Sequence, residues 1–88
     1  MQHELKILPK YFADIAFREK RFEIRKNDRD FKVGDILKLN EYDGEKYTGH
    51  FIRRNVIYIH HGDGKYGLEE GYCVLGLSEH EWGKGRWR

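Results

Sequence analysis

Lys20, Glu23 and Arg25 bring three charged groups of different chemistry together at short spacing. On a β-strand Glu23 and Arg25 share one face, with Cα atoms roughly 6–7 Å apart. A carboxylate accepts hydrogen bonds from the amino groups of a planar heterocycle, and a guanidinium donates in pairs to carbonyl or phosphate oxygens. Lys20 precedes the strand closely enough for its long side chain to reach the same pocket. The group predicts a polar binding site, although a surface ladder of salt bridges has the same pattern.

The strand that carries this group is expected at residues 21–26, where Phe22 and Ile24 alternate with charged residues. Alternate side chains of a strand lie on opposite faces, so we expect Phe22 and Ile24 to anchor the strand to the core. Turn-forming residues follow at 27–30 and at 33–35, which we expect to fix the geometry of the site.

The rest of the chain predicts one helix and several short strands. The helix is expected at 11–19, and further strands at 3–8, 36–42, 47–60 and 72–77. Pro9 is tolerated in the first turn of a helix, and the doublet Arg53-Arg54 breaks the alternation of the longest strand, which predicts a β-bulge there. The expected fold class is α+β, mainly β: a small barrel of about five strands with one main helix beside a cleft, in a single domain over 1–88.

Charge and length limit the classes of function. The chain has 88 residues and a net charge of +2, which does not indicate a binder of nucleic acid that relies on charge alone. Individual basic residues are still candidate contacts to a nucleic-acid backbone: Arg21, Lys26, Arg29, Arg53 and Arg54. The tail at 78–88 places Trp82 and Trp87 among basic residues, and we expect Trp82 to cap the core.

Several other classes are disfavoured. Cys73 is the single cysteine, so an internal disulfide and a cysteine-based zinc site are excluded, and its apolar neighbours predict a buried thiol. His60 and His61 are adjacent and would point to opposite faces of a strand, so we expect no metal and no cofactor. No apolar run approaches the length of about 20 residues that a membrane helix needs, and we expect a cytoplasmic protein without membrane contact.

The order of several motifs resembles the DUF3850 family of small bacterial and phage proteins. The motifs include His3-Glu4-Leu5-Lys6, Lys20-x-x-Glu23-x-Arg25, Val33-Gly34-Asp35 and Gly71-Tyr72-Cys73-Val74-Leu75, within a core at 3–77. That family is similar to the ASCH domains of the PUA-like fold, and the resemblance implies a small β-barrel with a cleft that binds RNA or nucleotides. The ASCH signature Gly-x-Lys-x-x-Glu-x-Arg is matched here, except that Arg18 stands at the glycine position.

Three functions are consistent with this resemblance. The leading hypothesis is a non-catalytic module that binds RNA or a nucleotide in a cleft walled by Lys20, Glu23 and Arg25. The first alternative is an amidohydrolase that removes an acyl group from a modified cytidine, because some small ASCH proteins have this activity. Lys20 would then be catalytic together with Glu69 or Glu70, while Glu23 stands where those enzymes have threonine. The second alternative is a phage or bacterial regulatory module that binds a protein partner.

Overall fold

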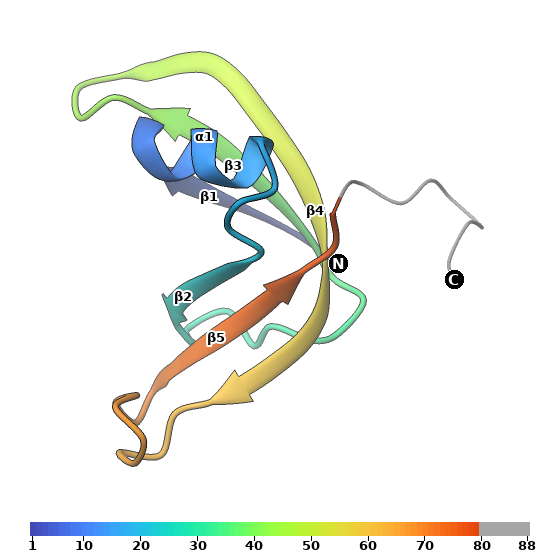
Figure 1. The fold of residues 1–88 in the computed structure, drawn as a ribbon, viewed down its shortest axis with the longest axis vertical. Helices are drawn as coiled ribbons and strands as arrows, with labels where there is room; N and C mark the ends of the chain where they lie inside the picture. The colour runs from blue at the N-terminus through green and yellow to red at the C-terminus, as the bar shows by residue number, and fades with distance from the viewer. Residues whose placement is uncertain (80–88) are drawn as a thin grey trace.

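The computed structural model of the chain describes residues 1–79, in which five strands and one helix are present (Figure 1). The elements in chain order are β1 (Gln2–Ile7), α1 (Pro9–Ala16), β2 (Phe22–Lys26), β3 (Ile36–Tyr42), β4 (Tyr47–His61) and β5 (Tyr72–Leu77). Each strand begins and ends within one residue of the limits expected from the sequence. The small, mainly β fold with one helix is therefore confirmed.

The strands form one sheet in the order β1-β3-β4-β5-β2. β1 runs parallel to β3, and the other neighbouring strands are antiparallel. β4 is long enough to serve both halves of the sheet: residues 47–55 pair with β3, and residues 56–61 pair with β5. Its curved course along the whole molecule is visible in Figure 1.

The prediction of a β-bulge at Arg53-Arg54 is wrong. These two residues pair without a register shift, opposite Lys38 and Leu37. The irregularities lie on either side of the doublet, one of them between Asn40 and Tyr42 of β3. The other lies between residues 56 and 58 of β4, where this strand leaves β3 and joins β5. The strand therefore deviates where it changes partners, a tertiary cause that the local sequence does not display.

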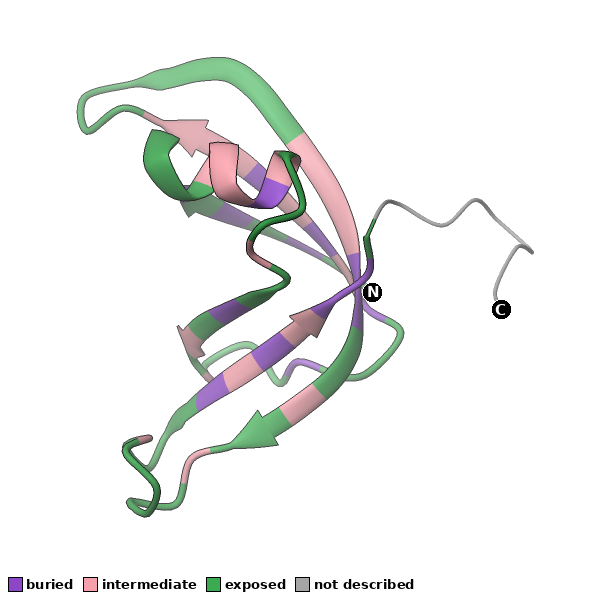
Figure 2. Ribbon diagram, in the orientation of Figure 1, coloured by how far each residue is buried: buried purple, intermediate pink, exposed green. Residues whose placement is uncertain are grey.

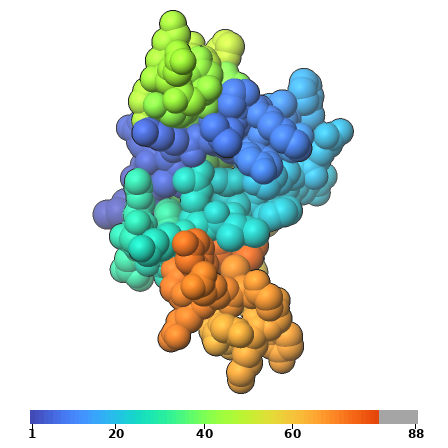
Figure 3. All heavy atoms as spheres, turned by 90° about the vertical axis from the view of Figure 1, so that its left-hand side faces the viewer, coloured from blue at the N-terminus to red at the C-terminus, as the bar shows by residue number. Residues whose placement is uncertain are grey.

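The expected closed barrel is not confirmed, because no ladder joins β1 to β2 in residues 1–79. Two arginine side chains lie across the opening instead. Nη2 of Arg25 donates to the carbonyl oxygen of Lys6 at 2.7 Å, and Nη1 of Arg29 donates to that of Glu4 at 2.8 Å. Figure 3 shows the residues of β2 and the loop after it, in cyan to teal, between the blue N-terminal segment and the orange segment before β5.

The core lies on the inner face of the curved sheet, where buried residues alternate with exposed ones along β1 and with mostly half-buried ones along β5 (Figure 2). Its buried hydrophobic residues are Leu5, Ile7, Ile15, Phe31, Leu37, Leu39, Val56, Cys73, Leu75 and Leu77. The prediction that Cys73 is buried is confirmed, and burial raises the pKa of its thiol. Helix α1 contributes Ile15 to this core, which holds the helix against the β1–β3 half of the sheet.

Helix α1 begins at Pro9 and ends at Ala16, three residues earlier than expected. The chain leaves the helix through Arg18, whose φ of 66° lies in the left-handed region. The amide of Lys20 then donates to the carbonyl oxygen of Asp14 at 3.0 Å. The amides of this turn donate hydrogen bonds to carbonyl oxygens at the end of the helix, and the turn places Lys20 next to the start of β2.

A buried polar cluster fixes the turn at residues 33–35 against the beginning of β1. Nε2 of His3 lies 2.8 Å from Oδ2 of Asp35, and the amide of Lys32 donates to the same oxygen at 3.0 Å. Burial by itself would raise the pKa of Asp35, but the hydrogen bonds from His3 and from Lys32 outweigh it, so the pKa lies below its ordinary value of 3.8. The turn expected at this position is confirmed, with Gly34 at a φ of 100°.

Candidate functional site

Strand β2 turns a charged side chain, and not its apolar ones, toward the interior. Glu23 is only 4% exposed, whereas Phe22 is 42% and Ile24 is 53% exposed. The register accounts for this orientation, because Glu23 pairs with the fully buried Leu75 of β5 and paired residues of neighbouring strands lie on the same face. The expectation that Phe22 and Ile24 anchor the strand to the core is therefore wrong.

The carboxylate of Glu23 joins the two cations expected beside it. Its Oε1 accepts a hydrogen bond from Nζ of Lys20 at 2.6 Å. Its Oε2 accepts from Nε of Arg25 at 2.9 Å and from Nη2 at 2.7 Å. The structure thus brings the three candidate ligand-binding residues together, as one buried carboxylate between two cations that are about one-fifth and one-quarter exposed.

This arrangement leaves hydrogen-bond donors of both cations for another molecule. An ammonium has three N–H donors, and Lys20 directs one of them to Glu23. The guanidinium of Arg25 uses Nε and Nη2 on Glu23 and Lys6, while its Nη1 has no hydrogen-bond partner within residues 1–79. One negative charge between two positive ones gives the group a net positive charge, which favours electron-rich or anionic ligands.

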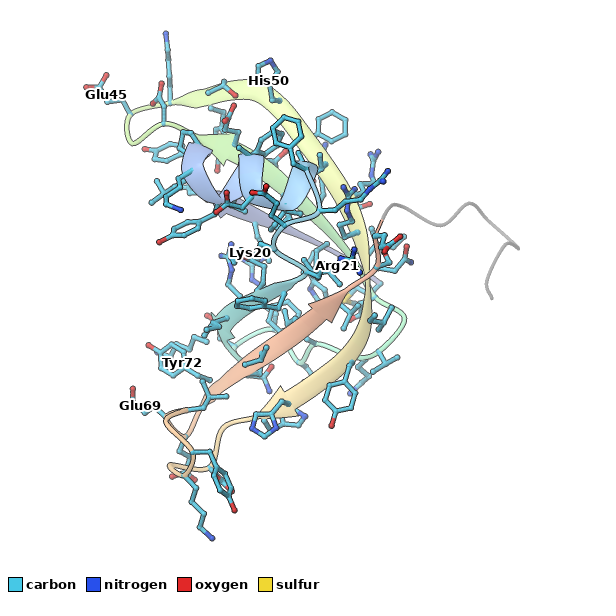
Figure 4. The ribbon with its side chains drawn as sticks, in the orientation of Figure 1. Lys20, Arg21, Glu45, His50, Glu69 and Tyr72 are labelled. Carbon is cyan, nitrogen blue, oxygen red and sulfur yellow. The ribbon has the colours of Figure 1, made fainter. Side chains whose placement is uncertain are left out.

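A pocket of about 520 Å³ lies between α1 and β2, beside this group. It is lined by the three charged residues, by the end of β1 and by Tyr11, Phe22 and Ile24. Nζ of Lys20 lies 4.8 Å from the ring centroid of Tyr11 and 5.2 Å from that of Phe22, and Figure 4 shows Lys20 between the helix and the strand. The exposed side chain of Phe22, at the start of β2, therefore forms part of the wall of the pocket.

Sequence reasoning missed Tyr11 and Phe22 as pocket residues. Tyr11 lies one turn before Ile15, at the edge of the apolar face of the same helix, and it is 43% exposed. An aromatic residue at this edge, on the helix that leads to Lys20, was the available signal. For Phe22 the alternation along the strand pointed to the core, so its role emerges only from the structure.

The five candidate contacts to a nucleic-acid backbone do not line this pocket; they are Arg21, Lys26, Arg29, Arg53 and Arg54. Arg21 forms an ion pair with Glu79 at 2.9 Å. Arg29 reaches the edge of β1, as described above. Arg53 lies on β4 with its guanidinium carbon 5.0 Å from the ring centroid of Phe51.

Glu69 and Glu70 belong to the segment between β4 and β5. Figure 4 shows Glu69 near the lower tip of the molecule, well separated from Lys20. Neither glutamate lines the pocket beside α1. The structure therefore places Lys20 against Glu23 and does not bring it together with Glu69 or Glu70.

Residues 1–79 contain no group of three or more His, Cys, Asp or Glu side chains placed to hold a metal ion. They also contain no helix with the length and apolar character needed to cross a membrane. Trp82 and Trp87, with the basic residues around them, lie outside the described residues.

Comparison with known proteins gives a family and one relative. The family model described as "Domain of unknown function (DUF3850)" matches residues 2–77. A protein of Escherichia phage P2, described as "Uncharacterized 12.9 kDa protein in GpA 3'region", is 37% identical over 54 residues. That match covers 61% of this chain and 50% of the phage protein, so the chain spans half the length of this relative.

Proposed function

Because the chain belongs to the DUF3850 family, whose description assigns no function, we propose from the geometry of the pocket that the protein binds RNA or a nucleotide between α1 and β2. One observation carries the proposal. A buried carboxylate holds an ammonium and a guanidinium beside two exposed aromatic rings, in a pocket of about 520 Å³. Pockets for small ligands commonly measure about 300–1,000 Å³, so a nucleotide fits this size class.

Each part of the pocket has a role in binding a nucleotide. The rings of Tyr11 and Phe22 offer apolar surfaces against which a base can stack, as unpaired bases do on aromatic side chains. Lys20 and Arg25 donate to carbonyl or phosphate oxygens, and the guanidinium can do so in pairs. These groups tolerate several bases, so the pocket by itself favours a class of ligand over one particular base.

Glu23 acts mainly by positioning the two cations. Its two oxygens accept three hydrogen bonds out of about four that a carboxylate can accept. One lone pair is left for an amino group of the ligand. Since the cations are held in place before a ligand arrives, less conformational entropy is lost on binding.

The resemblance to ASCH domains of the PUA-like fold supports the same proposal, because it implies a cleft beside the single helix that binds RNA or nucleotides. Within this reading, the side chains of Arg25 and Arg29 span the gap between β1 and β2, where a further ladder would close a barrel. The open sheet is therefore compatible with a barrel-like form that is completed by side chains.

The proposed module is non-catalytic. An amidohydrolase reading needs Lys20 to act with Glu69 or Glu70, and neither glutamate lines the pocket. Incubation with N4-acetylcytidine distinguishes the two functions, and we expect no release of acetate. Release that is lost in Lys20→Met would replace this part of the proposal with a hydrolase.

Binding is tested by fluorescence anisotropy with a labelled single-stranded RNA of about ten nucleotides and by calorimetry with the four nucleoside 5'-monophosphates. We expect Lys20→Met to weaken binding roughly tenfold, because it removes a charge-assisted donor and leaves an apolar side chain of similar length. The matched control is Lys65→Met, since Lys65 lies in the segment between β4 and β5 and not in the pocket. Absence of binding by the wild-type protein, or equal binding by Lys20→Met, would overturn the proposal.

A further inference from the structure

A second groove, of about 730 Å³, runs along the face of β1, β3 and β4 that is turned away from the core. Four cationic side chains line it, those of Lys6, Arg25, Arg29 and Lys38, against the single carboxylate of Glu4 among its lining residues. The whole chain carries a net charge of only +2. The groove is therefore a local concentration of positive charge on a nearly balanced surface, which is complementary to a polyanion.

Aromatic rings alternate with these cations. Phe51 is 44% and Tyr47 is 54% exposed, and both line the groove. Nζ of Lys38 lies 4.5 Å from the ring centroid of Phe51, and the guanidinium carbon of Arg53 lies 5.0 Å from it. The register explains this grouping, because Lys38 pairs with Arg53 on the neighbouring strand and side chains of paired residues share a face.

The groove and the pocket between α1 and β2 meet at two residues. Lys6 and Arg25 line both of them. At this point Nη2 of Arg25 donates to the carbonyl oxygen of Lys6 and also to Glu23 at the base of the pocket. An extended ligand that leaves the pocket past Arg25 therefore enters the groove directly.

We propose that the groove is a second binding site, which holds the phosphates and stacked bases of a single-stranded nucleic acid whose neighbouring base lies in the pocket. The inference rests on the proposed function, and it extends the ligand from a single nucleotide to a strand of several nucleotides. Cationic side chains with aromatic rings between them are the combination that single-strand binders use, because every base has a face that can stack. Bases paired within a duplex do not expose those faces, so a duplex cannot stack its bases on the rings of Tyr47 and Phe51.

The test compares binding of the four nucleoside 5'-monophosphates with binding of single-stranded RNA of about four, eight and twelve nucleotides, a range that covers the usual site sizes. We expect the affinity of the wild-type protein to rise with length. A plot of the logarithm of the binding constant against the logarithm of the salt concentration has a negative slope. For the longer RNAs, Lys38→Met should make this slope less steep by about 0.7, because one phosphate contact is lost. The affinity for the monophosphates should stay unchanged. Lys65→Met is the matched control and should leave both unchanged.

Stacking is tested by replacing an aromatic residue of the groove. Phe51→Leu and Tyr47→Leu should each weaken binding of the longer RNAs roughly tenfold. Both side chains are about half exposed, so the two variants are expected to fold. The matched control is Tyr58→Leu, because Tyr58 is 65% exposed on β4 and lies outside the groove.

The outcomes separate this inference from the proposed function. If Lys20→Met loses binding and the groove variants bind like the wild-type protein, the proposal of a groove site is contradicted and the proposal of a pocket site is supported. Loss in the groove variants, with wild-type behaviour of Lys20→Met, would overturn the pocket and support a nucleic-acid site in the groove alone. Equal affinity for a duplex RNA would contradict the single-stranded ligand. A DNA oligomer of the same sequence tells whether the 2'-hydroxyl contributes, and we expect Lys38→Met to weaken DNA and RNA alike.

Discussion

Arg18 has a backbone conformation that a residue with a Cβ atom adopts at a cost. Its φ is 66°, at the turn between α1 and β2. We expect Arg18→Gly to be more stable than Arg18→Ala by about 1 kcal/mol, because glycine adopts this region freely and alanine does not. Urea denaturation of the two variants measures the difference. Equal stabilities would show that the left-handed conformation costs this chain nothing.

Asp35 links the stability of the protein to pH. Burial raises the pKa of Asp35, but the hydrogen bonds from His3 and Lys32 lower it by a larger amount. The folded-state pKa therefore lies below 3.8. Between the folded-state value and 3.8 the unfolded chain binds more protons, and stability therefore rises with pH in this window. The contribution of Asp35 is fully present above the unfolded value and is lost as the pH falls through the folded value.

We expect Asp35→Asn to lower the free energy of unfolding at pH 7 by about 1.5–3 kcal/mol, the usual contribution of hydrogen bonds to a charged group. The difference from the wild-type protein should shrink as the pH falls below 3.8. Denaturation at a series of pH values measures it. Asp63→Asn is the control, because the carboxylate of Asp63 accepts a hydrogen bond only within an exposed segment. A difference that stays constant down to acid pH would contradict the role given to Asp35.

At the scale of single elements, β2 shows what alternation can and cannot predict. The period of two was right, and it correctly separated Glu23 and Arg25 from Phe22 and Ile24. It could not tell which set faces inward, because that depends on the partner strand and on Lys20, which supplies the charge that makes a buried carboxylate tolerable. The grouping of Lys20, Glu23 and Arg25 was predictable from the sequence, but the burial of Glu23 was not.

The orientation of β2 predicts an unusual ranking of substitutions. Ile24→Ala should cost less than about 1 kcal/mol because Ile24 is 53% exposed. Glu23→Gln should cost about 1–3 kcal/mol, since it leaves two partly buried cations without their counter-charge. Thermal and urea denaturation give both values, with Glu69→Gln as the control outside the pocket. A larger loss in Ile24→Ala than in Glu23→Gln would mean that the strand faces the other way.

At the scale of the whole molecule, the strand limits were predictable and the closure of the sheet was not. Apolar alternation and turn residues define each strand locally, as at Asp43-Gly44 before β4. Whether β1 and β2 pair depends on the curvature of β4 and on how far the side chains of Arg25 and Arg29 reach. Neither feature can be predicted from a local sequence pattern. The groove was missed for the same reason, because its cations come from distant parts of the chain.

The central claim is that the pocket between α1 and β2 binds a nucleotide. An NMR titration with the four nucleoside 5'-monophosphates, read from ¹H–¹⁵N spectra, tests it most directly because a monophosphate is too short to need the groove. We predict that the largest amide shifts fall on Tyr11, Lys20, Phe22 and Arg25. In Lys20→Met they should need roughly tenfold more nucleotide to reach half their size, whereas Lys65→Met should titrate like the wild-type protein. Shifts confined to the segment between β4 and β5, or no shifts with any of the four nucleotides, would contradict the claim.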